Sequence, residues 1–504
     1  MARTVLALDL GTGGVKSALY DASGACLAER VQNYRTYFPA PGLHEQDLGE
    51  WWDAVSTSIR ALLDAPGVDR SAVGAISISG HSLGCIPLDA ADQPLLQRVP
   101  IWSDARAGAE AEAFFRRFDY ERWYGLTGNG FPAPLYPIFK ILWLRANHPD
   151  VLARTRSIAG SKDYINLRLC GRHATDPSYA SGSGAYDLHA SAFSDEILAA
   201  AGLDRDLLPE IVPSTEVLGT VRAGVAAELG LPDGVVVVAG GVDNSCMALG
   251  ARTFREGDFY GSMGSSSWLT VSSAKPVLDS RVRPFAFAHV VPGQIISATS
   301  IFSSGTSLSF VKDLLMAGEA AGYDELFALA GSAPFGANGL LFVPTLGGGT
   351  SLEGGPDVRG AFVGLDLSHG RADMLRASLE GIALGLRVAL DELRRLAGVS
   401  RTMTIVGGGS RSPLMRQIMA DLLDCTIVKT SIDQQSASLG AAALAMVATG
   451  SWSDMTPLIG LHEVEDRHEP DAGTADLAAR MLQAYRAAAE SQRALAPLLS
   501  ALRT

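Results

Sequence analysis

The sequence predicts an α/β protein built from two domains with a cleft between them. The chain has 504 residues, which is too long for one hydrophobic core and suits two domains that each bury their own interior. Helical and strand-like periodicities alternate along it, as in α/β folds. A plan of strand, small-residue turn and strand occurs at residues 4–20 and again at 258–273. We therefore expect two lobes of related fold, residues 1–253 and 254–504.

The first half begins with a predicted β-hairpin. Residues 6–10 place three leucines on one face, and a second strand-like run follows a glycine turn at 15–20. Residues 51–63 have the apolar spacing of a helix, and 73–79 are typical of a strand. The continuous apolar run at 235–239 suits a buried central strand, whose carboxyl end is where ligands bind in such sheets.

The second half continues the alternation after its own hairpin. A strand is expected at 339–344, and the glycine-rich segment 347–357 is predicted to be an active-site loop, because periodic segments resume directly after it. The remaining predicted elements are a helix at 371–396, a strand at 402–406 and a helix at 413–423 that Ser412 caps and Pro413 begins.

The composition excludes several classes of function. A formal net charge of −13 without any basic run argues against a nucleic-acid or anionic-membrane partner. The five cysteines are scattered, odd in number and lack a C-x-x-C pair, so neither disulfides nor zinc is indicated. No apolar stretch is long enough for a signal peptide or a membrane span. We expect a soluble cytoplasmic protein.

The first candidate site lies in the opening hairpin. Its glycines Gly11 and Gly13 let backbone N–H groups converge, Thr12 adds a hydroxyl and Lys16 a positive charge, which together suit a polyphosphate. Asp9 could hold Mg²⁺ through water. A plain glycine hairpin explains the same residues when the motif is taken alone. The segment is neither a Walker A loop nor a G-x-G-x-x-G fingerprint, which weakens a dehydrogenase interpretation.

Three further constellations follow in the chain. Asp243 comes just after the buried strand, where a carboxylate could accept a proton from a hydroxyl, although an Asx turn is the alternative. Residues 261–267 offer donors to a second phosphate. At 405–413 a strand runs through glycines into a capped helix, where a planar base could lie against backbone. Each signal is weak alone, but their order along the chain forms one consistent set.

From Asp9 to about Ala443, the chain resembles the FGGY carbohydrate kinases. The resemblance is carried by residues 360–365 and 373–380, which follow the family's C-terminal signature closely. The N-terminal signature is looser: it includes Pro137, Lys140, Trp143 and Asn147, with departures at Leu135 and Ala146. The resemblance implies two actin-like or hexokinase-like (ribonuclease H-like) domains, ATP and Mg²⁺ as cofactors, and a homodimer as the usual assembly.

The resemblance also implies roles for single residues. Asp243 matches the proton acceptor of the family. The matching phosphate-binding residues are Gly11, Thr12, Gly13, Lys16, Gly264, Ser265 and Ser266, and the adenosine-contacting ones are Gly305, Gly408 and Gly409. The sugar-facing ones are His81, Ser82, Leu83, Trp102 and Asp104.

The sugar segment departs from its relatives. Where kinases of D-xylulose usually show Gly-Gln-Met-His-Gly, this chain has Gly80-His-Ser-Leu-Gly84. His81 could donate to a sugar hydroxyl or be a satisfied structural histidine. The Glu-Arg pair that many relatives carry after Pro344 is also missing. D-xylulose is the first expected substrate, with L-xylulose, ribulose, xylitol and erythritol as alternatives. A non-catalytic actin-like ATPase is the rival outside the kinase class.

Overall fold

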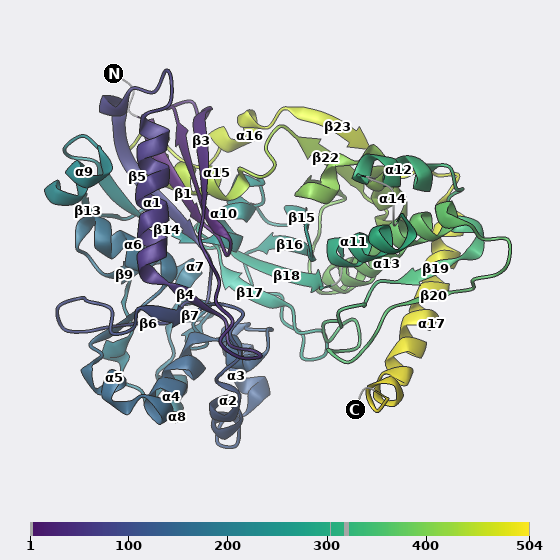
Figure 1. The fold of residues 1–504 in the computed structure, drawn as a ribbon, viewed down its shortest axis with the longest axis horizontal. Helices are drawn as coiled ribbons and strands as arrows, with labels where there is room; N and C mark the ends of the chain where they lie inside the picture. The colour runs from purple at the N-terminus through teal and green to yellow at the C-terminus, as the bar shows by residue number, and fades with distance from the viewer. Residues whose placement is uncertain (1–3, 303, 317–321, 503–504) are drawn as a thin grey trace.

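The computed structural model describes residues 4–302, 304–316 and 322–502, and Figure 1 shows two lobes side by side. The sheet of the first lobe contains, in spatial order, β13 (Val217–Thr220), β14 (Val236–Val242), β5 (Val73–Gly80), β1 (Thr4–Leu10), β2 (Gly14–Tyr20) and β3 (Cys26–Asn33). The sheet of the second contains β17 (Phe285–Ala288), β18 (Ile295–Ile301), β16 (Ser267–Ser273), β15 (Phe259–Met263), β21 (Thr402–Val406), β22 (Thr426–Thr430) and β23 (Val464–His468).

The two sheets share one topology, which confirms the predicted repeat. In the first, β1 pairs antiparallel with β2 and parallel with β5, which in turn pairs parallel with β14. In the second, β15 pairs antiparallel with β16 and parallel with β21, which pairs parallel with β22. Each hairpin therefore stands beside two parallel strands whose carboxyl ends reach the same edge as its turn. This edge is where ligands bind in such sheets.

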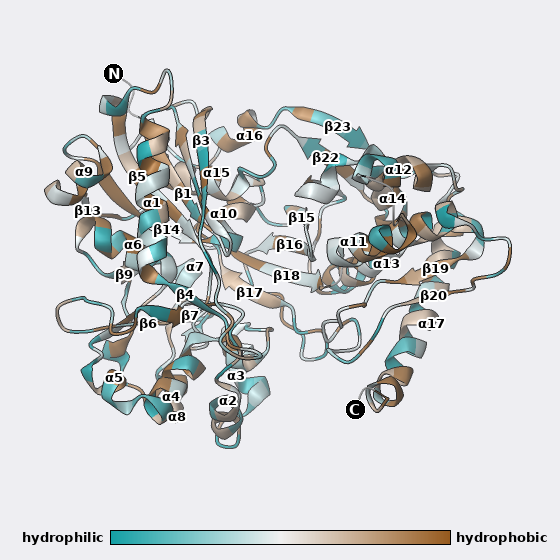
Figure 2. Ribbon diagram, in the orientation of Figure 1, coloured by the Kyte–Doolittle hydropathy of each residue, from teal (hydrophilic) through white to brown (hydrophobic). Residues whose placement is uncertain are grey.

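Helix α1 (Leu48–Leu63) covers one face of the first sheet. It begins three residues before the predicted start, because the Asp47 side chain accepts hydrogen bonds from the N–H groups of Gly49 and Glu50 and so caps the helix. Its apolar face, which includes Trp51 and Ile59, is buried against the sheet. In contrast, β3 is an edge strand that is largely exposed, and Figure 2 shows that it mixes hydrophilic and hydrophobic residues.

The other face of the first sheet is covered by a helix from the far end of the chain. Helix α15 (Ser436–Ala448) packs on β1 and β5, next to α10 (Asp243–Gly250). Its leucines and alanines join one hydrophobic cluster with side chains of β1, β2 and β14. The core of the first lobe is thus completed by residues beyond 253, while the division at 253 stays a prediction about domains.

In the second lobe, the long α13 (Arg371–Leu396) and α14 (Pro413–Leu423) form the core with β19 (Leu341–Val343), which pairs with β20 (Ala361–Val363). The predicted elements at 371–396, 402–406 and 413–423 are confirmed with those bounds.

Smaller elements surround this frame. The other helices are α2 (Gly108–Phe115), α3 (Tyr120–Thr127), α4 (Pro137–Asn147), α5 (Pro149–Arg154), α6 (Ser161–Cys170), α7 (Pro177–Ala180), α8 (Asp195–Ala201), α9 (Ala223–Leu229), α11 (Gly305–Leu315), α12 (Tyr323–Gly331), α16 (Pro457–Leu461) and α17 (Ala475–Ser500). The short strand pairs are β4 (Glu45–Asp47) with β7 (Arg98–Pro100), β6 (Ile86–Leu88) with β8 (Ser157–Ala159), β9 (Ala174–Thr175) with β12 (Glu210–Ile211), and β10 (Tyr186–Asp187) with β11 (Ala192–Phe193).

Candidate active site

Two carboxylates stand at the ligand-binding edge of the first sheet. Asp9 lies near the end of β1 and pairs in register with Ser79 of β5, whose hydroxyl donates a 3.0 Å hydrogen bond to it. Asp243 is the first residue of α10, directly after β14, which flanks β5 on the other side. The parallel pairing of the three strands thus brings together two acids that are far apart in the sequence.

The electrostatics of Asp243 suit a proton acceptor. Burial raises its pKa to about 7, and repulsion by Asp9 contributes in the same direction. Its carboxylate accepts a hydrogen bond from the N–H of Asn244 at 2.8 Å, and its side chain is only partly covered. A carboxyl group with a pKa near neutrality is a general base matched to neutral pH.

The first predicted phosphate turn closes the β1–β2 hairpin. The N–H of Gly11 donates to the carbonyl of Gly14 at 3.0 Å, which tightens the turn. The hydroxyl of Thr12 accepts a hydrogen bond of 2.9 Å from the indole of Trp102, so a predicted phosphate residue and a predicted sugar residue lie together. Lys16 is the cross-strand partner of Asp9, and its ammonium donates to the carbonyl of Gln434 at 2.6 Å.

The second predicted phosphate turn, Gly264–Ser266, closes the equivalent β15–β16 hairpin and rests on the start of α11. The N–H of Gly305 donates to the carbonyl of Gly264 at 3.1 Å, and that of Thr306 donates to Ser265 at the same distance. A Cβ at Gly305 would lie 2.4 Å from the Gly264 oxygen, and one at Gly407 would lie 2.6 Å from the Met263 oxygen. Three backbone segments therefore meet here because glycines leave room.

These segments form the floor of a cavity of about 770 Å³ in the second lobe. Gly264, Ser265, Gly305, Gly408 and Gly409, all predicted to contact ATP, line it together. Its apolar walls come from α11, α12, α13 and α14, and include Leu308, Phe327, Ile382 and Met415. A glycine floor next to apolar walls has the size and character of a site for a nucleoside with its phosphates.

We expect Gly305→Ala to weaken ATP binding selectively. The added methyl group would displace the second phosphate turn, so the KM for ATP should rise about tenfold, equivalent to about 1.4 kcal/mol, with little change in the KM for the sugar. Steady-state kinetics with each substrate varied would measure this. Gly224→Ala, where a Cβ meets no atom within 4 Å, is the matched control. An unchanged KM for ATP in Gly305→Ala would contradict the placement of the turn.

The predicted sugar segment is largely buried. His81 is 1% exposed, with its ring edge-on to Trp51 at 5.1 Å. Neither ring nitrogen has a hydrogen-bond partner among the described residues, and burial lowers the pKa of His81 to about 4, so the ring is neutral. Leu83 is also 1% exposed and has a φ of 60°, unusual for a residue with a Cβ. A role for His81, Ser82 and Leu83 in sugar binding stays a prediction.

Trp102 and Asp104 differ in accessibility. Trp102 is 37% exposed, whereas Asp104 is fully buried. Both oxygens of Asp104 accept charge-assisted hydrogen bonds of 2.7 Å from Arg106, and one also accepts from the N–H of His44 at 2.6 Å. These bonds fix the loop that carries Trp102. A direct contact of Asp104 with a sugar hydroxyl stays a prediction.

A buried hydrogen-bond network, which the sequence did not predict, contacts the residue that precedes Asp243. The N–H of Val242 donates to the hydroxyl of Ser178 at 2.9 Å, and that hydroxyl donates to Asp176. Asp176 caps α7 and lies 3.1 Å from the ammonium of Lys162. The Asp-Pro-Ser start of α7 was a visible cap signal, but its contact with β14 depends on long-range packing.

Trp268 lies two residues after the second phosphate turn on β16, and its ring packs against Phe285 at 5.0 Å and Phe131 at 6.1 Å. Among the residues that the structure describes, there is no cluster of three metal-ligating side chains. Within the same residues, no helix has the length and apolar character needed to cross a bilayer.

Comparison with known proteins identifies relatives over nearly the whole chain. Residues 4–250 match the N-terminal domain model, and 259–449 the C-terminal domain model, of the FGGY family of carbohydrate kinases. A xylulose kinase of Lactococcus lactis is 30% identical over 457 residues, 90% of this chain and 89% of its own. A gluconokinase of Bacillus licheniformis is 28% identical, covering 93% and 92%. The crystal structure of xylulose kinase from Rhodospirillum rubrum has a TM-score of 0.90 at 29% identity, covering 98% and 99%.

Proposed function

The chain belongs to the FGGY family of carbohydrate kinases and phosphorylates a small sugar with ATP; we propose that the sugar is D-xylulose and that Asp243 is the base. The observation that carries this proposal is the position of Asp243, with its pKa near 7, at the same edge of the first sheet as the first phosphate-type turn. Several relatives named xylulose kinase support D-xylulose. Gluconate is the second candidate, because a gluconokinase is about equally similar.

In the proposed reaction, Asp243 accepts the proton of the attacking sugar hydroxyl. As the sugar oxygen bonds to the γ-phosphorus, the bond from that phosphorus to the bridging oxygen of ATP breaks, and the electron pair leaves with ADP. The backbone N–H groups of the two turns would cradle the phosphates, while the cavity of the second lobe would hold the nucleoside. Positioning and charge neutralisation are what such a transfer demands of the protein.

Mg²⁺ is implied by the family, and the residues at this edge fit it. Asp9 offers hard oxygen donors, and a single carboxylate rather than a full protein cage is enough for Mg²⁺ when phosphates and waters complete its shell. Asp9 would hold the ion, since its other partner is a single hydroxyl of Ser79. When bound, the ion would neutralise charge on the phosphates.

A coupled ADP-release assay tests the proposed substrate. We expect D-xylulose to give the highest kcat/KM in a panel with L-xylulose, ribulose, xylitol, erythritol, glycerol and gluconate, because specificity is a ratio of these values. Phosphorus NMR of the product identifies the hydroxyl. A higher value for gluconate would replace the substrate, whereas ADP release that no sugar stimulates would favour an actin-like ATPase.

The pKa of Asp243 predicts the acid side of the pH profile. A base must be unprotonated, so kcat/KM for the sugar should fall as pH decreases through about 7, approaching a tenfold loss per pH unit, because this parameter reports the enzyme form to which the sugar binds. The measurement is kcat/KM from pH 5.5 to 8.5 at saturating ATP. A profile that is flat between pH 5.5 and 8 would contradict the assignment.

A further inference from the structure

A second cavity, of about 260 Å³, lies where the two lobes meet. Phe131 contributes to it from the first lobe, and Phe285, Ser300, Phe302 and Thr350 contribute from the second. None of its lining residues belongs to the phosphate turns or to the segment around His81. The predicted loop at 347–357 does line it, through residues 349–352 and 356.

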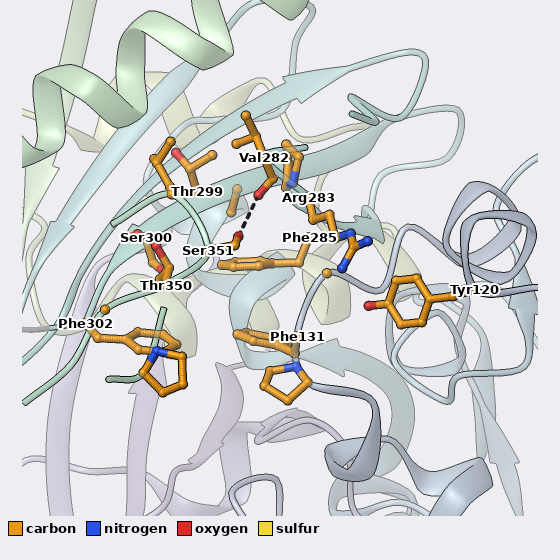
Figure 3. Close-up of a pocket in the computed structure, with 17 residues that line it drawn as sticks. Tyr120, Phe131, Val282, Arg283, Phe285, Thr299, Ser300, Phe302, Thr350 and Ser351 are labelled. Atoms are coloured by element: carbon orange, nitrogen blue, oxygen red, sulfur yellow. Dashed lines mark hydrogen bonds between the residues drawn. The ribbon is translucent and has the colours of Figure 1, made fainter. Parts of the chain in front are cut away.

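One side of this cavity is aromatic. The rings of Phe131 and Phe285 stack at a centroid distance of 4.3 Å and an angle of 15°. Figure 3 shows Phe302 across the cavity from them, on the side of Ser300 and Thr350. Phe302 is 46% exposed. Aromatic faces of this kind bind the apolar face of a planar or ring-shaped ligand.

Hydroxyl groups also line the cavity, and those of Thr299 and Ser300 lack a hydrogen-bond partner among the described residues. The side-chain oxygen of Ser300 is buried, in a residue 4% exposed, without a hydrogen bond among the described residues. A buried hydroxyl without a hydrogen-bond partner destabilises the protein, so a ligand that supplies a partner binds more favourably. Ser351, in contrast, is satisfied, because it donates to the carbonyl of Val282 at 3.2 Å.

Among the described residues that line the cavity, none carries an unpaired charge. Arg283 is the charged side chain among its described lining residues, and it is occupied: it pairs with Glu121 at 2.7 Å and lies over the ring of Tyr120 at 4.4 Å. A phosphorylated or carboxylate ligand would find no counter-ion here, and its desolvation would be uncompensated. The chemistry favours a neutral ligand that combines an apolar face with hydroxyl groups.

We propose that this cavity is a second sugar-binding site, which takes a neutral sugar or polyol between Phe302 and Phe131 with a hydroxyl bonded to Ser300. The site is distinct from that of the phosphoryl acceptor, because Asp243, Asp9 and Trp102 are not among its lining residues. Its ligand contacts residues of both lobes, and its binding therefore depends on how the lobes are placed.

Isothermal titration of the full-length protein without ATP tests the proposal, with xylitol and D-xylulose as separate probes. We expect two sites per chain. Ser300→Ala should weaken one of them about fivefold through the lost hydrogen bond, and Phe302→Ala about tenfold through the lost stacking. Thr350→Trp, which fills the cavity from its loop, should abolish that site. Phe310→Ala, at a phenylalanine that is 56% exposed outside the cavity, should leave both sites unchanged.

A single site in the unmodified protein overturns the proposal, and so does a second site that Thr350→Trp and Ser300→Ala leave intact. Circular dichroism establishes that each variant is folded, and a crystal soaked with xylitol should show the ligand within hydrogen-bond distance of Ser300. Glucose 6-phosphate should not compete for the second site; competition would refute its neutral character. Loss of kinase activity alone would refute the proposed function but leave this site, since binding is measured without turnover.

Discussion

Asp243→Asn is expected to lower kcat for sugar phosphorylation about a thousandfold, within the range that loss of a general base produces. Asparagine keeps the shape of the side chain but cannot accept the hydroxyl proton. ATP affinity should change little, because the nucleoside cavity lies in the other lobe. Single-turnover kinetics and ATP titration would separate the two effects. A kcat within tenfold of the parent protein would disprove the role of Asp243 as base.

At alkaline pH, Asp243→Asn should be more stable than the parent protein. This result would exclude misfolding as the cause of its inactivity. Burial raises the folded-state pKa of Asp243 from 3.8 to about 7. Between these values the carboxyl group is ionised in the unfolded chain but protonated in the folded protein, so the free energy of unfolding falls as pH rises from about 4 to 7. Asparagine avoids this loss. Thermal unfolding should show a higher midpoint for Asp243→Asn at pH 8 and no difference near pH 4. Asp258→Asn, at a half-buried carboxyl group with a raised pKa outside the site, should keep full activity.

Gly440→Val is expected to destabilise the protein by about 3 kcal/mol or to prevent its folding. Helices α10 and α15 cross so closely that a Cβ at Gly440 would lie 2.0 Å from the carbonyl oxygen of Cys246, and one at Gly250 would lie 1.8 Å from that of Ser436. Both clashes are with backbone, which cannot rotate away. Urea unfolding followed by circular dichroism measures the loss.

Gly398→Val is the matched control, because a Cβ there meets no atom within 4 Å. Its unfolding midpoint should stay close to that of the parent protein. Because α10 begins with Asp243, a folded Gly440→Val protein should also lose activity as the helix is pushed from its place. A variant with parental stability would show that the crossing of α10 and α15 tolerates a side chain.

Much of the fold follows from local signals. Leucines alternate with small residues in 4–20, and the same order of strand, turn and strand recurs at 258–273. This pattern predicted both hairpins and their structural similarity. Ser412 and Pro413 predicted the start of α14, which the structure confirms. The start of α1 was missed by three residues, because the capping role of Asp47 is visible only once its hydrogen bonds are known.

The candidate site was less predictable where the burial of a side chain determines whether it is available to a ligand. His81 was assigned to the sugar by the family resemblance, yet it is 1% exposed, and no pattern at the end of a strand shows how deeply the following loop is buried. Asp104 looked like an available acceptor, but Arg106 and the backbone of His44 occupy its oxygens. The path from Lys162 through Asp176 to Val242 joins residues about eighty positions apart, which no local pattern reveals.

By itself the sequence determined the α/β class, the two hairpins with their glycine turns, the order of the chemical motifs and the family. These features depend on backbone freedom and apolar periodicity within a few residues, which are local properties. Only the tertiary structure decided that α15 completes the core of the first lobe, that Asp9 stands near enough to Asp243 to raise its pKa, and that a mainly apolar cavity lies between the lobes. These depend on strand pairing and on side-chain packing between distant segments, where many partners are compatible with one local pattern.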